Sequence, residues 1–392
     1  SRGLGDVYKR QALNIINLIG TNIVNIILGF MIATAFMSMW ISNTATAVMM
    51  LPIAIAIVAQ LRDNPNTIED ENLNFGKALM LAIAYSASIG GVATLIGTPP
   101  NLVLAGVVEE TFGYEITFAK WFQFGFPISI ILLFICWKYL TSIAFKFKQK
   151  TFPGGREEIS KQLNALGRIS YEEKLVAGVF ALTAFAWISR SYLLESIIPG
   201  IDDTIIAMIG AIIIFLLPTK NRKRKILKWE EAVKLPWGIL LLFGGGMALA
   251  AGFKESGLAL WIGNQMTLLD GVSLILLVFI LIASVNFLTE ITSNLATTAM
   301  LLPILYPMSM TIDVHPFILM VSATVAASCA FMLPVATPPN AIVFGSGYLR
   351  IPDMVRVGIW MNLLSIVLLT LFVFFLLPYL WDFDPLVFIV PQ

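Results

Sequence analysis

The sequence predicts an all-α integral membrane protein of two inverted repeats, with two re-entrant helical hairpins and two broken transmembrane helices. Three observations support this fold class. The 392-residue chain is 58% hydrophobic and 12% charged, with a mean hydropathy of +0.85, whereas a soluble domain carries roughly 25% charged residues. A twelve-residue polar motif interrupts apolar sequence twice, and a Thr-Pro-Pro-Asn tetrapeptide follows each copy.

The two motifs indicate an internal duplication. SNTATAVMMLPI at 42–53 and SNLATTAMLLPI at 293–304 agree at eight of twelve positions, and Thr-Pro-Pro-Asn occupies 98–101 and 337–340. Both motifs recur in the same order, about 240 to 250 residues apart. Duplicated halves with helix breakers inside apolar segments are typical of secondary transporters.

Long uncharged stretches define the expected helices, because a spanning helix needs roughly 20 apolar residues. In the first half we expect a hairpin with arms at 25–41 and 45–61, each short for a full crossing. A helix from Phe75 to Ile96 follows, stops at Gly97 and continues to Val108. Further elements are expected as spans at 118–140, 172–194, 202–218 and 235–253, a second hairpin at 271–312, a broken helix at 316–349 and a last span at 355–380.

The repeat also predicts how the chain is divided. If the second half begins near Tyr171, about 120 residues precede Ser293, whereas 41 precede Ser42. We therefore expect that two or three N-terminal spans are missing and that residues 1–10, which lack an initiator Met, are foreign. The expected parts are an N-terminal scaffold remnant at 1–24, first-repeat transport elements at 25–110, scaffold and connecting spans at 111–253, second-repeat transport elements at 254–349, and a last span with the C-terminus at 350–392.

Basic residues predict the orientation of these elements. The segments 144–174 and 219–228 are rich in Lys and Arg and are expected in the cytoplasm. The acidic segments around Glu109 and Asp202 are then expected outside. Counting crossings from there, the first hairpin opens from the cytoplasm and the second from the exterior. Both Ser-Asn tips are therefore expected near the middle of the bilayer, facing a shared site.

The residue types at the tips suit a cation and a carboxylate. Hydroxyls and amides offer donors and acceptors without fixed charge, and the paired prolines lack N–H groups and so free backbone carbonyls. Such oxygens suit Na⁺, while the N-termini of half-helices suit an anion. No Lys or Arg is close to either tip in sequence, and Glu290 is the nearest acid. This pattern favours cation-coupled anion uptake over a proton relay, with Glu290 either supporting the hairpin or carrying a proton.

Other interpretations compete with a transport site. Small polar residues often mediate helix packing in membranes, and a Pro-Pro pair can mark a kink or a loop. An intramembrane enzyme needs an acid pair or a nucleophile with its base, which Glu290 and the distant His315 do not supply. A passive channel fits closed hairpin tips poorly. The net charge of +1 predicts no nucleic-acid partner, and Cys136 and Cys329, both in apolar stretches, are expected to be packing residues.

The chain resembles the divalent anion/Na⁺ symporter family over residues 29–380. The resemblance rests on SMWISNTATAVMMLPIA, SIGGVATLIGTPPN, TEITSNLATTAMLLPI and LPVATPPNAIVFGSG. It implies an ion-transporter-superfamily fold and a plasma-membrane homodimer that works as an elevator, with Na⁺ as a co-transported ion. The implied cargo is a C4-dicarboxylate such as succinate, malate or fumarate. Sulfate or citrate as cargo, and dicarboxylate exchange without Na⁺, are the alternatives.

The resemblance also implies ligands for each site. One Na⁺ site would use Ser38, Ser42, Asn43 and Gly91, and the other would use Thr289, Ser293, Asn294 and Ala336, largely through backbone oxygens. Substrate carboxylates would contact Asn43, Thr44, Ser293 and Asn294, with Thr337 and Pro338 nearby. One position departs from the family pattern, because Leu295 replaces the usual Thr of the second tip. That change predicts a more apolar pocket end and puts the standard substrate preference in question.

Overall fold

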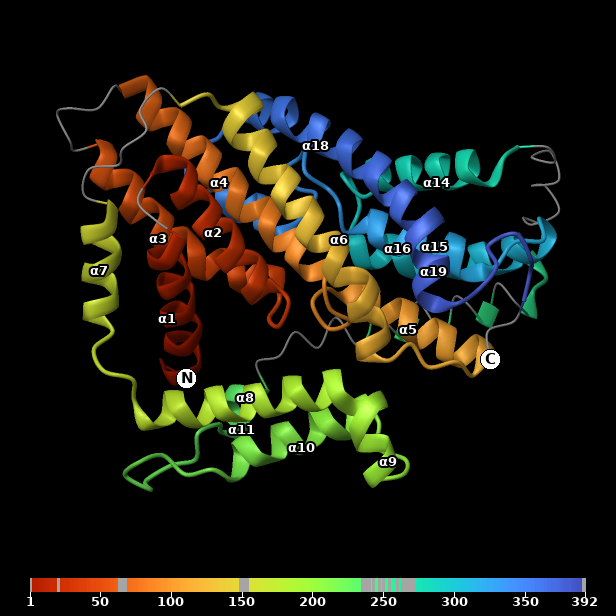
Figure 1. The fold of residues 1–392 in the computed structure, drawn as a ribbon, viewed down its shortest axis with the longest axis horizontal. Coiled ribbons are helices and arrows are strands. Elements are labelled where there is room, and N and C mark those ends of the chain that lie inside the picture. The colour runs from red at the N-terminus through yellow and green to blue at the C-terminus, as the bar shows by residue number, and fades with distance from the viewer. Residues whose placement is uncertain are drawn as a thin grey trace.

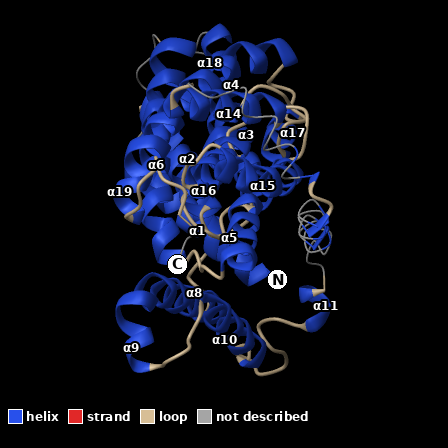
Figure 2. Ribbon diagram, turned by 90° about the vertical axis from the view of Figure 1, so that its right-hand side faces the viewer, coloured by secondary structure: helices blue, strands red, loops and turns tan. Residues whose placement is uncertain are grey.

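The computed structural model describes residues 2–19, 22–62, 69–147, 155–233 and 272–389, with isolated positions between 241 and 261. Within these ranges every regular element is a helix, as Figure 1 and Figure 2 show. The expected all-α class is therefore confirmed for the described chain. Most of the expected span at 235–253 and the first residue of the second hairpin, Gly271, lie outside the described residues.

The first half follows the expected order of elements. A helix–turn–helix pair, α2 and α3, precedes the broken helix α4 and α5, and α6 is the next long helix. The helices up to residue 165 are α1 (Arg2–Ile19), α2 (Ile23–Ser38), α3 (Asn43–Arg62), α4 (Glu69–Val92), α5 (Pro99–Phe112), α6 (Phe118–Tyr139) with its π-helical extension η1 (Leu140–Ala144), and α7 (Gly155–Ala165).

The second half repeats this arrangement after a connecting layer. The connecting layer consists of α8 (Tyr171–Ser189), η2 (Arg190–Leu194), α9 (Glu195–Ile197), α10 (Asp203–Leu216) and α11 (Trp229–Ala232). The repeat elements are α14 (Leu274–Leu288), α15 (Asn294–Thr311), α16 (Pro316–Ala327), α17 (Pro338–Phe344), α18 (Ile351–Leu371), η4 (Phe372–Leu376) and α19 (Leu377–Trp381).

The break in the first long helix comes earlier than the sequence predicts. α4 ends at Val92 rather than Ile96, and residues 93–98 have no helical structure. The Asn101 side-chain amide donates to the carbonyls of Gly91 at 3.3 Å and Thr94 at 2.8 Å. In a continuing helix these carbonyls would accept backbone N–H groups of the next turn. Because the Asn101 side chain replaces those donors, the helix can end there. α7 is a second departure, because the sequence predicted no helix between the spans at 118–140 and 172–194.

Two helices of equivalent position form the centre of the molecule. All twelve residues of α16 are buried, and so is almost all of the apolar part of α4. Tyr85 of α4 contacts Phe331, which lies in the unwound segment after α16; the two rings meet edge-on with centroids 5.0 Å apart. Such complete burial explains why neither helix has an amphipathic pattern. The remaining repeat helices surround this pair.

The hairpins enter this core from opposite ends. In Figure 1 the open ends of α2 and α3 lie at the upper left, above α7. The start of α14 and the end of α15 lie on the right-hand side of the same view. The α8–α10 layer lies below the rest in both views, and Arg10 of α1 joins it through Glu173, with Nε and Oε2 3.0 Å apart.

Four described helical segments are long and apolar enough to cross a membrane. They are Asn72–Val92, Phe118–Ala144, Tyr171–Ile197 and Ile351–Trp381. The hairpin arms Ile23–Ser38 and Leu274–Leu288 are apolar but shorter. At 1.5 Å per residue their 16 and 15 residues extend about 24 and 22 Å.

Candidate functional site

The tip of the first hairpin brings a hydroxyl, an amide and a backbone carbonyl together. Ser38 is the last residue of α2 and Asn43 is the first of α3, because the chain reverses direction over residues 39–42. Ser38 Oγ lies 2.6 Å from Asn43 Oδ1 and 2.7 Å from the Ala87 carbonyl oxygen. A hydroxyl has one proton to donate, so it cannot satisfy both acceptors. The tip is therefore rich in oxygen atoms that could bind a cation.

The unwound loop after α4 approaches this tip closely because glycine occupies two positions. A Cβ at Gly91 would lie 2.7 Å from Asn43 Oδ1 and 3.2 Å from the Gly97 carbonyl oxygen. A Cβ at Gly97 would lie 2.4 Å from the Gly91 carbonyl oxygen. Any larger residue would therefore push the loop and the tip apart. The structure thus brings Ser38, Asn43 and Gly91 together, as expected of one site.

The tip of the second hairpin repeats the same geometry. Thr289 Oγ1 lies 2.7 Å from Asn294 Oδ1 and 3.1 Å from the Ala327 carbonyl oxygen. Thr289 and Ser38 are fully buried, whereas Asn294 and Asn43 are half-buried. The two tips are therefore equivalent in three dimensions as well as in sequence.

Two asparagines that the sequence analysis did not assign to the site hold the unwound loops in place. Asn340 Nδ2 donates to the carbonyls of Ala330 at 3.3 Å and Leu333 at 3.0 Å. Asn101 makes the corresponding pair of bonds in the first repeat. Both residues are fully buried. The signal for their role was present, since each is the last residue of a Thr-Pro-Pro-Asn motif.

Glu290 binds the second unwound loop directly. Its Oε1 accepts the backbone N–H groups of Phe331 at 2.8 Å and Met332 at 3.0 Å, and its Oε2 accepts that of Leu333 at 2.9 Å. Asn362 Nδ2 donates to Oε1 at 2.7 Å. The two oxygens of the buried Glu290 side chain therefore accept four hydrogen bonds in total. This favours the supporting role for Glu290 over the proton-carrying one.

The remaining expected site residues are placed less closely together. Ser42 and Ser293 are exposed at the tips, and Ser42 Oγ accepts the Ala45 N–H at 3.2 Å. Thr337 and Ala336 are buried, and the Thr337 hydroxyl accepts the Asn340 N–H at 3.2 Å. Thr44 and Pro338 are exposed on the first turns of α3 and α17.

A cavity of about 640 Å³ lies beside the tips. Ser42 of the first hairpin and Leu295 of the second both line it, together with α5 and parts of α8 and α10. Leu295 is almost fully buried, and its isobutyl group adds apolar surface to the cavity lining. Among the described residues that line the cavity, none is Lys or Arg. Ser42 is the one expected site residue among the described lining residues; the expected substrate-binding residues are not among them, namely Asn43, Thr44, Ser293, Asn294, Thr337 and Pro338.

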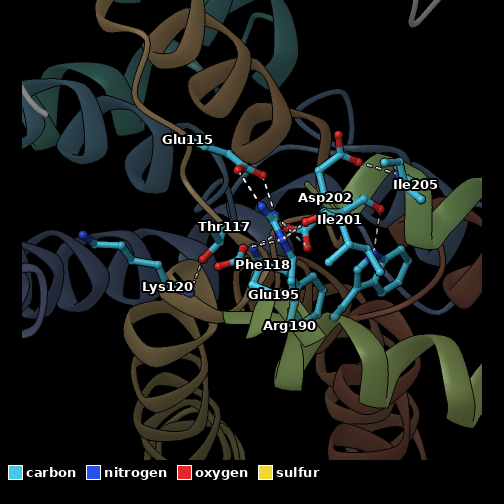
Figure 3. Close-up of polar contacts among 11 residues, drawn as sticks. Glu115, Thr117, Phe118, Lys120, Arg190, Glu195, Ile201, Asp202 and Ile205 are labelled. Atoms are coloured by element: carbon cyan, nitrogen blue, oxygen red, sulfur yellow. Dashed lines mark hydrogen bonds and ion pairs between the residues drawn. The ribbon is translucent and has the colours of Figure 1, made fainter. Parts of the chain in front are cut away.

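Three acidic residues of the described chain line the cavity: Glu109, Glu115 and Asp203. One arginine, Arg190, contacts two of them, and Figure 3 shows its contact with Glu115. Arg190 of η2 binds Glu115 through both terminal nitrogens, at 2.5 and 2.8 Å, and lies 3.2 Å from Asp203 Oδ1. The Asp203 carboxylate also accepts the Phe118 N–H at 2.7 Å. These bonds join the start of α6 to the α8–α10 layer.

Comparisons with known proteins agree on a transporter. The family model described as the sodium:sulfate symporter transmembrane region matches residues 2–381. The chain is 50% identical over 379 residues to the sodium-dependent dicarboxylate transporter SdcS of Staphylococcus saprophyticus, covering 95% of this chain and 73% of that protein. It is 48% identical over 385 residues to SdcS of Staphylococcus aureus strain USA300, covering 97% and 74%.

Two solved structures share the fold at low sequence identity. Neisseria gonorrhoeae MtrF, described as illuminating a class of antimetabolite efflux pumps, gives a TM-score of 0.61 at 13% identity and covers 95% of this chain and 79% of that one. The Alcanivorax borkumensis YdaH transporter gives 0.55 at 13%, covering 98% and 84%. These structures support the fold, and the sequence matches establish the family. The chain belongs to the sodium:sulfate symporter family, the divalent anion/Na⁺ symporters that its paired motifs predicted.

Proposed function

We propose that this chain is a Na⁺-coupled symporter of C4-dicarboxylates such as succinate, malate and fumarate, acting in the plasma membrane. The observation that carries the proposal is the matched oxygen cluster at each hairpin tip. The relatives that are 48% and 50% identical over the aligned residues are named sodium-dependent dicarboxylate transporters. Their name supports transport of a dicarboxylate together with Na⁺, and the oxygen clusters supply atoms that could bind such a cation.

Each tip is proposed to bind one Na⁺. At both tips a buried hydroxyl lies close to two acceptor oxygens but has only one proton to donate, so one acceptor is left without that hydrogen bond. In transporters with broken helices, oxygens freed in this way coordinate Na⁺. The first site comprises Ser38, Ser42, Asn43 and Gly91, and the second comprises Thr289, Ser293, Asn294 and Ala336.

The dicarboxylate is proposed to bind between the tips. α3 begins at Asn43 and α15 begins at Asn294, and a helix N-terminus carries roughly half a positive charge. Because no described cavity-lining residue is cationic, the bound Na⁺ ions supply the remaining positive charge. Carboxylate contacts are assigned to Asn43, Thr44, Ser293 and Asn294, with Thr337 and Pro338 nearby.

The hairpins are proposed to be re-entrant and the protein to work as an elevator. One arm of each hairpin, α2 or α14, extends about 22 to 24 Å, which is shorter than a hydrocarbon core of about 30 Å, and the two hairpins open at opposite ends of the molecule. The α8–α10 layer would belong to a fixed scaffold in a homodimer. Several large apolar side chains of that layer are exposed, as lipid or a second protomer requires: Leu182, Phe185, Met208, Ile209 and Ile212.

Uptake into proteoliposomes tests the proposal. An inward Na⁺ gradient is expected to raise the initial rate of labelled succinate uptake at least about tenfold over a K⁺ or choline gradient, since each 1.4 kcal/mol of coupling is a factor of ten. Vesicles without protein give the background. Uptake that is indifferent to the Na⁺ gradient would exclude symport and leave Na⁺-independent exchange.

The same assay separates the alternative cargoes. Unlabelled malate and fumarate are expected to compete with labelled succinate, because they share two carboxylates at a similar spacing. Sulfate and citrate are expected to compete weakly at equal concentration. Stronger competition by either one would change the assigned substrate while leaving the Na⁺ sites in place.

A further inference from the structure

A second cavity lies away from the hairpin tips. It has a volume of about 870 Å³ and is formed by the start of α4, the end of α6 with η1, and the first half of α18. None of the proposed transport residues lines it. The proposed function does not use this cavity.

One end of this cavity has an excess of positive charge. Lys77 and Asp353 form an ion pair, with Nζ and Oδ1 2.9 Å apart, and so neutralise each other. Lys146 and Arg356 also line the cavity and are exposed. No carboxylate of the described chain forms an ion pair with either of them. Two positive charges therefore face the cavity without an ion-pair partner among the described side chains.

The rest of the cavity wall is apolar and opens outward. Along α18 the lining residues recur every three or four positions, so they follow one face of the helix. They change from Asp353 and Arg356 at the start of the helix to Trp360, Leu363 and Leu364. The 11 residues between Asp353 and Leu364 correspond to a length of about 16 Å. Trp360 is 61% exposed and Ile143 is 70% exposed, so this wall is open on its flank.

This order of charge and apolar surface matches a lipid of the inner leaflet. The charged end lies beside the basic segment 144–174, which the positive-inside rule places in the cytoplasm. The cytoplasmic leaflet is the anionic one, and basic pockets between helices on that side bind anionic head groups. The exposed apolar residues lie deeper along the same face, where acyl chains would be.

We propose that this cavity binds an anionic phospholipid, with its phosphate on Lys146 and Arg356 and an acyl chain along Trp360 and Leu363. The ion pair between Lys77 and Asp353 holds α4 against α18 and so forms the floor of the head-group end. Binding at this place ties the lipid to three helices of the two repeats. The proposal requires only that the chain is a membrane transporter, and it does not depend on which anion the protein transports.

Lipid binding to the purified full chain tests this proposal. Native mass spectrometry with equal amounts of phosphatidylglycerol and phosphatidylcholine is expected to show preferential retention of phosphatidylglycerol. The double substitution Lys146→Gln/Arg356→Gln is expected to reduce that preference by about thirtyfold, since a basic residue near an anionic surface contributes roughly a fivefold factor. Lys220→Gln/Lys223→Gln removes the same charge from the other basic loop, whose side chains do not line the cavity, and is expected to keep the preference within twofold.

Each other outcome overturns the proposal. Equal loss in both double variants would mean general surface attraction, and an unchanged preference in Lys146→Gln/Arg356→Gln would mean that the lipid binds elsewhere. Competition with millimolar inorganic phosphate distinguishes a phospholipid site from a site for free phosphate. If inorganic phosphate displaces phosphatidylglycerol as effectively as the chain-free head group glycerophosphoglycerol does, and the intact lipid binds no more tightly than that head group, the site binds free phosphate and the proposal fails. An unchanged melting temperature of the double variant confirms that it is folded.

Discussion

Substitution of Asn43 or Asn294 by alanine is expected to abolish Na⁺-driven succinate uptake. Each amide oxygen lies within 2.7 Å of the buried hydroxyl of its tip, Ser38 or Thr289, and each residue is assigned to a Na⁺ and a carboxylate. Interactions with charged groups contribute roughly 1.5–3 kcal/mol each, so losing two is expected to reduce uptake at least about a hundredfold. Initial uptake rates in proteoliposomes measure this effect.

The two substitutions are expected to have equal effects because the tips are equivalent. Asn164→Ala, in the exposed last turn of α7, is the matched control and is expected to transport normally. Monodisperse elution and an unchanged melting temperature in the absence of Na⁺ would show that the tip variants are folded. Normal transport by either tip variant would refute the assignment of that tip.

Glu290→Gln is expected to destabilise the fold by about 3 kcal/mol. The substitution preserves size but replaces an acceptor oxygen with an N–H donor, which then faces the backbone N–H of Phe331, Met332 or Leu333. An unsatisfied buried donor costs roughly 1–3 kcal/mol, and the remaining bonds weaken because they lose their charge assistance. A lower melting temperature in detergent measures the loss.

Glu110→Gln is the matched control for that experiment. Glu110 is exposed near the end of α5, so the same chemical change there is expected to leave the melting temperature unchanged. A Glu290→Gln protein that melts like the wild type but no longer transports would contradict the supporting role. Such a protein would instead favour the proton-carrying alternative.

The sequence predicted the hairpins and the breaks because those features are local. Proline and glycine end helices through their own geometry, so Pro99 and Pro338 mark the starts of α5 and α17 correctly. The second copy of the motif then located the second hairpin. The boundaries of α2, α3, α14 and α15 lie within three residues of the expected arms wherever an arm was defined.

The supporting contacts could not be predicted, because they depend on how the chain folds back. Asn101 reaches carbonyls seven and ten residues before it, and this is feasible only once the chain has unwound between them. Glu290 binds backbone groups some forty residues away. Arg190 joins the α8–α10 layer to Glu115, 75 residues earlier. Periodicity and residue type do not encode such pairings.

Binding of succinate to the purified protein, measured by titration calorimetry in Na⁺ and in choline, tests the central claim most directly. If Na⁺ at the two tips supplies the positive charge that the cavity lacks, succinate is expected to bind in Na⁺ and not in choline. By linkage, succinate is then expected to tighten Na⁺ binding by the same factor. Equal succinate affinity in choline would contradict the account, because the site would then hold a dianion without either cation.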